Sequence, residues 1–151
     1  MKTFNNILVV SRSTYGCVKA LSKGISLARK FGSKLHILHV IYDPFYFNGW
    51  NIPIKHFNNE FQDVVMKARD ELDHLVAKEK SEGMDITEWV KYGKPVDEIE
   101  KVVESEKIDL IIMMAHEEGR LEHFLFGRTN EAIVRHLPAT LMLVKKSYRN
   151  D

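Results

Sequence analysis

The sequence predicts an α/β fold, a doubly wound five-stranded parallel sheet with helices on both faces. Short apolar runs that suit strands alternate with longer segments whose apolar residues recur at helical spacing. The runs are continuously apolar, as expected for parallel strands that are buried on both faces. The 151 residues suit one domain, taken here as residues 1–151, and no internal repeat divides them.

The first half of the chain predicts two strands and two helices. Ile7 to Val10 is the first strand, and apolar residues at helical spacing predict a helix over residues 15–31. Leu35 to Tyr42 is the second strand. A connection rich in aromatic residues runs from Asp43 to Asn59, and the clearest helical stripe of the chain follows from Phe61 to Val76.

The second half predicts three strands and two helices. Ile86 to Tyr92 is a weaker, more polar strand that we place toward an edge of the sheet, and Pro95 suits the first turn of the helix that follows it. Because crossovers between parallel strands are right-handed, the favoured strand order is 3-2-1-4-5. The remaining elements are a strand from Ile108 to Ala115, a helix from Gly127 to His136 and a strand from Ala139 to Lys145.

A binding site is expected where this strand order reverses, between the first and fourth strands. In open α/β sheets, ligands bind outside the carboxyl ends of the strands at such a switch point. The segments that reach this edge end or follow the first, second and fourth strands, or open the next helix. The predicted binding residues are therefore Ser11, Arg12, Ser13, Val40, Met114, Ala115, His116, Gly127, Arg128 and Thr129.

The composition argues against several classes of protein. Lys and Arg number 22 against 21 Asp and Glu, whereas nucleic-acid binders usually have a basic excess. Cys17 is the single cysteine, so no internal disulfide can form and a reducing cytoplasm is expected. No apolar run approaches the roughly 18 residues of a membrane helix, and the amino-terminal run is too short for a signal peptide. We therefore expect a cytoplasmic protein that contacts neither nucleic acid nor membrane.

Segments near both ends of the chain carry a family resemblance. Residues 6–10 read N-I-L-V-V, and residues 135–144 read R-H-L-P-A-T-L-M-L-V, with an R-H-x-P signature before the last strand. With the predicted strand order, the chain resembles the universal stress protein (UspA) family over residues 5–146. The resemblance implies a Rossmann-like fold of the adenine nucleotide alpha hydrolase type. Residues 114–122, M-A-H-E-E-G-R-L-E, resemble the first domain of E-type tandem universal stress proteins.

Nucleotide-binding members of this family carry G-x2-G-x9-G-[S/T] after the fourth strand, where glycines let backbone N–H groups approach phosphates. Alignment on Gly127 as the third glycine puts Met114 and Glu117 at the first two glycine positions. Arg128 then stands at the Ser or Thr position, and Arg12 stands at the family's aspartate after the first strand. Because a carboxylate repels a triphosphate, most strongly in a low-dielectric cleft, Glu117 is the most damaging change.

This degenerate motif predicts a universal stress protein that acts as a stress-response binding or signalling module, with no enzymatic activity. ATP is disfavoured as a cofactor, although Arg12 and Arg128 could pair with an anionic or partly apolar small ligand. One alternative is an ATP- or AMP-binding protein with weak hydrolysis, in which Gly127 and Thr129 hold phosphate. Another is a ligand-free interaction module. The aromatic segment 42–57 could cover a ligand or contact a partner.

The last strand, Thr140 to Val144, is expected at an edge of the sheet. Apolar edges attract other strands, and the family resemblance implies antiparallel pairing of this strand between two subunits. We therefore expect a homodimer. The alternative is an edge strand that is capped by the polar tail K-K-S-Y-R-N-D at residues 145–151.

Four histidines are possible ligands or catalytic groups. His116 and His123 could join nearby carboxylates in a metal site, but zinc needs three or four ligands and a solvated polar loop is favoured. His36 and His39 share a strand at an odd spacing, which places them on opposite faces of the sheet. We expect both to be buried and hydrogen-bonded, and we predict no metal site.

Nucleophilic side chains gather before the first predicted helix. Ser11, Ser13 and Thr14 could bind phosphate or attack a substrate, but hydroxyls at this place more often cap the helix. Cys17 could be reactive, because helix N-termini lower thiol pKa values. Since no base can be assigned to it from the sequence, we favour a structural cysteine, and we predict no catalytic residues.

Overall fold

The computed structural model describes residues 3–11, 17–41, 58–115, 135–136 and 139–145. Their five strands form one parallel sheet in the order β3-β2-β1-β4-β5, which confirms the predicted doubly wound topology. The strands are β1 (Asn6–Ser11), β2 (Lys34–Ile41), β3 (Ile86–Tyr92), β4 (Leu110–Ala115) and β5 (Thr140–Lys145).

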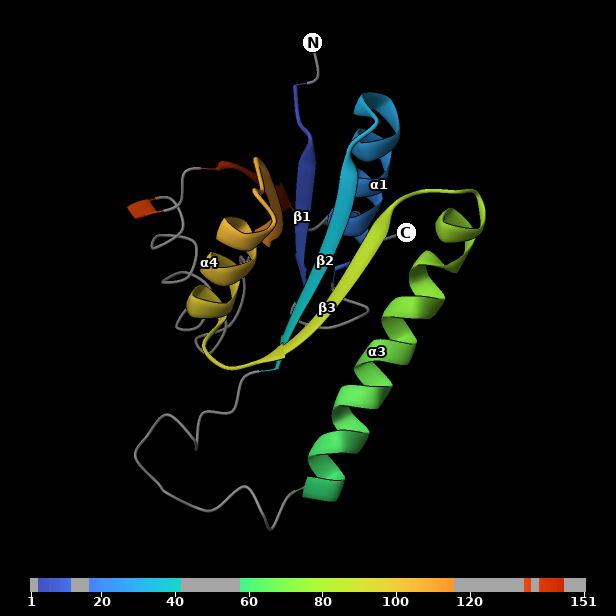
Figure 1. Ribbon diagram of the computed structural model, residues 1–151, viewed down its shortest axis with the longest axis vertical. Coiled ribbons are helices and arrows are strands. Elements are labelled where there is room, and N and C mark those ends of the chain that lie inside the picture. Colours follow the sequence, from blue (N-terminus) through green and yellow to red (C-terminus); the bar gives the residue numbers. More distant parts are fainter. Residues whose placement is uncertain (1–2, 12–16, 42–57, 116–134, 137–138, 146–151) are drawn as a thin grey trace.

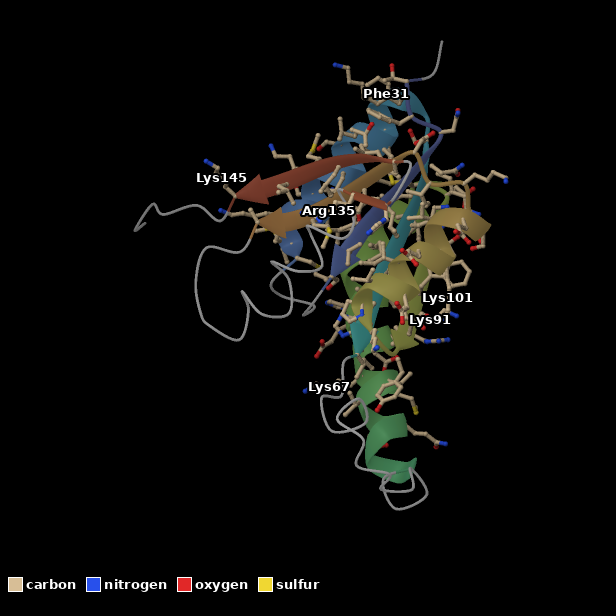
Figure 2. The ribbon with its side chains drawn as sticks, turned by 90° about the vertical axis from the view of Figure 1, so that its left-hand side faces the viewer. Phe31, Lys67, Lys91, Lys101, Arg135 and Lys145 are labelled. Carbon is tan, nitrogen blue, oxygen red and sulfur yellow. The ribbon has the colours of Figure 1, made fainter. Side chains whose placement is uncertain are left out.

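Three described helices cover the sheet. Helices α1 (Val18–Phe31) and α3 (Asn58–Ser81) pack on one face, and α4 (Pro95–Ser105) packs on the other (Figure 1). The first half of α3 extends past the carboxyl ends of the strands, where Lys67 points outward (Figure 2). Among the described residues, no helix has the length and apolar character needed to cross a membrane.

Strand β1 is buried on both faces. Ile7 and Val9 point into the cluster beneath α1 and α3, whereas Leu8 and Val10 point into the cluster beneath α4. None of these four side chains is more than 4% exposed. This double burial explains why the strand reads as a continuous apolar run, since a strand with one solvated face would alternate.

The two outer strands differ in character. Every residue of β3 is only partly buried, as predicted for an edge strand, and the strand carries the charged residues Glu88 and Lys91. Strand β5 forms the opposite edge and ends at Lys145 (Figure 2), with four consecutive apolar residues from Leu141 to Val144. The sheet therefore has one polar and one apolar edge.

Several predicted boundaries are wrong by a few residues. The fourth strand begins at Leu110 because Lys107 adopts φ 53° and the Ile108 N–H donates to the Val103 carbonyl, which makes a turn. The helix expected from residue 15 begins at Val18.

Some predicted boundaries differ only slightly, and others lie outside the described residues. Helix α3 begins at Asn58, inside the predicted connection from Asp43 to Asn59, and the last strand begins at Thr140 instead of Ala139. Of the helix predicted over residues 127–136, only Arg135 and His136 are described, and both are helical. The rest of that helix and of the aromatic connection lies outside the described part of the chain.

Helix α1 approaches the sheet closely at Gly24. A Cβ at this position would lie 2.5 Å from Val9 Cγ2 and 3.3 Å from Leu35 Cδ1, and the first distance is shorter than real carbon contacts allow. Valine is stiff at χ1 and sits here in a filled core, so it has little room to move. Glycine at this position therefore sets the distance between α1 and β1.

We expect Gly24→Ala to lower the free energy of unfolding by about 1–2 kcal/mol. Overpacking costs roughly 1–3 kcal/mol, which exceeds the gain of up to about 1 kcal/mol from better helix propensity. Urea denaturation would measure the change, with Ser22→Ala on the exposed face of α1 as a control that keeps or slightly raises stability. A stabilised Gly24→Ala variant would contradict the close approach.

A half-buried ion cluster joins α3 to β3. Lys80 Nζ lies 2.6 Å from Glu88 Oε1 and 3.5 Å from Asp73 Oδ1, and the Glu88 side chain is only 8% exposed. Burial raises the pKa of the Glu88 carboxyl, and its hydrogen bond with Asp73 raises that pKa further, against the pull of Lys80. The same hydrogen bond is the main cause that lowers the pKa of Asp73. Of the two carboxyls, Glu88 therefore binds a proton more readily than Asp73.

This cluster predicts opposite pH trends for two neutral substitutions. The raised pKa of Glu88 stabilises the fold below the carboxyl's unfolded pKa and loses that effect as pH rises, so Glu88→Gln should gain on the wild type from pH 4 to 7. Asp73→Asn should become less stable relative to the wild type as pH rises from about 2 to 5, because a lowered pKa stabilises the fold above the carboxyl's unfolded pKa of about 3.9 and that effect is lost as pH falls through the lower folded value. Thermal melts from pH 2 to 7 should resolve the two trends, since about 1 kcal/mol shifts the melting temperature by roughly 2–4 °C at this size. The change should be smaller for Asp73→Asn, because the Asp73 side chain is 55% exposed and its charge is screened by solvent. Trends of the same sign would contradict the assignment of the proton.

Candidate functional site

The two halves of the sheet separate at the predicted switch point. Pairing of β1 with β4 ends at Val9 opposite Ile112. Beyond that point β1 continues along β2 as far as Ser11, while β4 continues along β5 as far as Ala115. The carboxyl ends of the strands at such a switch point are the usual ligand position in this class of fold.

Four of the ten predicted binding residues belong to the described part of the chain. Ser11 ends β1, Val40 lies near the end of β2, and Met114 and Ala115 end β4. Ser11 and Met114 continue the pattern of residues that face α1, whereas Val40 packs in the cluster beneath α4. The other six, which lie outside the described residues, are Arg12, Ser13, His116, Gly127, Arg128 and Thr129.

Ser11 does not cap the first helix, so that part of the prediction is wrong. The residue before α1 is Cys17, and the Cys17 side chain makes no capping hydrogen bond to this helix end. Ser11 is 1% exposed, and its Oγ lies 3.4 Å from His39 Nδ1 on the adjacent strand. Its hydroxyl therefore has a partner across the sheet. Ser13 and Thr14, the other predicted caps, lie outside the described residues.

Cys17 is buried, as expected for a structural cysteine. Its side chain is 1% exposed. Burial raises the pKa of the thiol, while hydrogen bonds from Ser11 and from its own backbone lower that pKa to a lesser degree. A thiol whose pKa is raised forms little thiolate at neutral pH, so it is a poor nucleophile.

The two strand histidines lie on opposite faces, as predicted. His39 faces α1 and α3 beside Ser11, whereas His36 faces α4, where its Nδ1 accepts a hydrogen bond of 3.4 Å from Trp89 Nε1. Burial is the main cause that lowers the pKa of both imidazoles. Both are therefore neutral at pH 7, and sequence spacing revealed their faces but not their partners.

The described floor of the site carries no formal charge. It consists of Ser11, Met114 and Ala115, and Met114 packs partly against the core beneath α1. Arg12 and Arg128, which could supply positive charge for an anionic ligand, lie outside the described residues. Among the described residues, no three Cys, His, Asp or Glu side chains gather as a metal site, and His116 and His123 lie outside that set.

Comparison with known proteins decides the family. The model of the universal stress protein family matches residues 3–145, nearly the whole chain. The chain belongs to the universal stress protein family. Universal stress protein MJ0577 of Methanocaldococcus jannaschii is 25% identical over 99 residues, which cover 65% of this chain and 61% of that relative. A Staphylococcus haemolyticus member is 24% identical over 148 residues, 96% of this chain and 87% of the relative.

Solved universal stress proteins share the fold of this one. The structure of MJ0577 superposes with a TM-score of 0.74 at 21% identity, covering 96% of this chain and 98% of that one. A universal stress protein in complex with cAMP gives 0.62 at 17% identity over 95% and 98% of the two chains. An Archaeoglobus fulgidus member in complex with dAMP gives 0.61 at 14% identity over 96% and 100%. At these identities the likeness establishes the doubly wound fold alone.

Proposed function

We propose that this universal stress protein is a cytoplasmic stress-response binding and signalling module, with no turnover of its own and without ordinary Mg-ATP binding. Met114 carries the proposal. It occupies the position of the first motif glycine, and its half-buried side chain packs at the carboxyl end of β4 against the core beneath α1. A side chain there fills space that glycine leaves open for backbone N–H groups to approach phosphate.

The charges of the motif support a ligand other than a triphosphate. Glu117 stands at the second glycine position, where a carboxylate repels the phosphates. Arg12 and Arg128 replace an acidic and a hydroxyl residue, so both add positive charge that can pair with a smaller anion. We therefore favour an anionic, partly apolar small molecule as the ligand of this site.

Calorimetric titration with ATP and Mg²⁺ tests the proposal. The purified protein should give no binding heat with ligand up to about 1 mM, which corresponds to less than roughly 4 kcal/mol of binding free energy. Thermal melts in the presence of ATP should not shift. A Kd in the micromolar range would overturn the proposal and make Gly127, Arg128 and Thr129 a working phosphate site.

A double substitution tests whether Met114 and Glu117 are the residues that hinder ATP binding. The double variant Met114→Gly, Glu117→Gly should bind ATP at least about tenfold more tightly than the wild type, because both obstacles to phosphate are removed. Met142→Gly is the matched control, since Met142 packs against the same cluster from β5. If the double variant binds ATP no better than this control, the obstacle to ATP lies elsewhere.

A second candidate is a nucleotide-binding universal stress protein with weak ATP hydrolysis. It is favoured by the similar folds of family members solved with cAMP and dAMP, both of which are monophosphates. A monophosphate avoids the charge of a triphosphate near Glu117. Titration with AMP and cAMP in addition to ATP therefore separates the two candidates. If none of the three nucleotides gives binding heat, a different small ligand or a protein partner remains.

We also propose that the protein forms a homodimer through β5. This strand pairs with β4 alone among the described strands, and it presents an uninterrupted apolar run that includes Leu143, which is 46% exposed. The opposite edge strand carries Glu88 and Lys91, charges that discourage strand addition. The contrast between the edges supports pairing at β5.

Leu143→Lys should convert the dimer to a monomer, because pairing at β5 would bury the new charge. Light scattering after size exclusion would measure the molar mass at matched concentrations. Val64→Lys is the control, since Val64 on α3 is similarly exposed at 51% and far from β5 in sequence. A monomeric wild type, or a dimer that survives Leu143→Lys, would contradict pairing at this edge.

A further inference from the structure

The Trp89 side chain meets a buried histidine on the face of the sheet that α4 covers. Trp89 lies on the edge strand β3 and packs partly against the core cluster beneath α4. Its indole Nε1 donates a hydrogen bond of 3.4 Å to Nδ1 of His36, which is 0% exposed on β2. Lys91 Nζ lies 5.2 Å from the centre of the Trp89 ring. A half-buried indole therefore contacts both an imidazole and a cation.

This hydrogen bond sets the protonation state of His36. An indole N–H can only donate, so Nδ1 carries no proton and the neutral ring holds its one hydrogen on Nε2. Nε2 is buried and has no hydrogen-bond partner among the described residues. Within that part of the chain, the Trp89 indole is therefore the single hydrogen-bond partner of this ring.

We propose that His36 and Trp89 form an acid-sensitive contact, in which protonation of the imidazole removes the acceptor for the indole N–H and the indole turns away from β2 toward solvent. The backbone of β3 stays in place, because it pairs with β2 from Ile86 to Tyr92. The change concerns one side chain on an edge strand, so it is independent of the ligand that the candidate site takes.

The contact cannot survive protonation in any orientation of the ring. A protonated imidazole is a donor at both nitrogens, so rotation of the ring offers Trp89 no acceptor. Two N–H groups would then face each other where one hydrogen bond had been, and buried donors without acceptors are costly. Trp89 is only partly buried, so its N–H can reach water by turning outward. The same movement admits water to the imidazolium, which lowers the cost of its buried charge.

The charged groups around His36 act in both directions. Burial lowers the pKa of the imidazole most, and Lys34 on the same strand lowers it further. Glu106, just after α4, and Asp85, just before β3, raise that pKa. Because the folded-state pKa lies below the unfolded value of about 6.5, the contact is complete at pH 7 and is lost as pH falls through the folded value.

The other elements that pack around His36 add one more charge. Leu8 of β1 and Thr87 of β3 lie opposite His36 on its two neighbouring strands, and both are uncharged. The residues of α4 in the cluster on this face are apolar. Lys91, over the Trp89 ring, adds positive charge on the β3 side. A further positive charge on His36 is therefore disfavoured while the indole stays in place.

Nuclear magnetic resonance reads both partners in one titration. We would follow the His36 ring hydrogens and the Trp89 indole N–H from pH 8 to 4, with Trp50→Phe to remove the second indole signal. Both should change with one midpoint below about 6.5, and the balance should shift about tenfold per pH unit, as for a single proton. A neutral gadolinium chelate, which attenuates exposed hydrogens, should attenuate the indole signal in acid and spare it at pH 8.

Three variants separate the contact from a general effect of acid. His36→Asn should keep the indole in place at every pH, because its amide oxygen can accept near the position of Nδ1 and does not titrate. Trp89→Phe should raise the midpoint of His36, since no donor then opposes a proton on Nδ1. His39→Asn is the matched control: His39 is also a buried histidine of β2, but it faces the other side of the sheet. The Trp89 profile should be unchanged in this variant.

Four results would overturn the proposal. The first is an indole signal that shifts in acid without attenuation by the chelate, which would mean that the indole feels the charge but does not move. The second is a His36 midpoint that Trp89→Phe leaves unchanged, and the third is a His36 that stays neutral down to pH 4. The last is loss of the backbone amide signals of β3 together with the indole signal, which would indicate unfolding. If His36→Asn does not fold, the wild-type titration and Trp89→Phe still decide.

Discussion

The central position of β1 imposes the main constraint on this protein. It pairs with β2 on one side and β4 on the other, and helices cover both of its faces, so nothing polar fits along its length. Polar groups are therefore confined to its ends. At the amino end the Asp109 carboxylate accepts hydrogen bonds from the Asn5 and Asn6 N–H groups, and at the carboxyl end Ser11 contacts His39. The site lies at an end of the sheet because the middle cannot hold polar chemistry.

The same constraint made much of the fold predictable from sequence. Strands buried on both faces read as continuous apolar runs, which identified β1, β2 and β4, and the polar residues of Ile86 to Tyr92 placed β3 at an edge. Boundaries were less predictable. Ile108 reads as part of the apolar run, but the positive φ of Lys107 turns the chain before the strand begins. The direction of the chain after α4 cannot be predicted from the spacing of apolar residues.

The site was less predictable than the fold, because side-chain partners depend on tertiary contacts. Ser11 has the chemistry of a helix cap, yet its position opposite His39 gave its hydroxyl a partner 28 residues away. Alternation on β3 does place Glu88 on the same face as Ile86 and Val90. Its contacts with Asp73 and Lys80, however, depend on the angle at which α3 crosses β3. The spacing of apolar residues along a helix does not predict that crossing angle.

The unlike edges of the sheet bear on how copies of this chain can assemble. A sheet with two receptive edges could add strands at both sides and grow into an open-ended filament. Here one edge strand is apolar, whereas the other carries the charged residues Glu88 and Lys91. A strand that can pair at β5 therefore finds no equivalent edge at β3. An isologous contact at a single edge closes on itself and stops. The difference between the two edges therefore disfavours growth into fibres, while the β5 edge stays available for one partner strand.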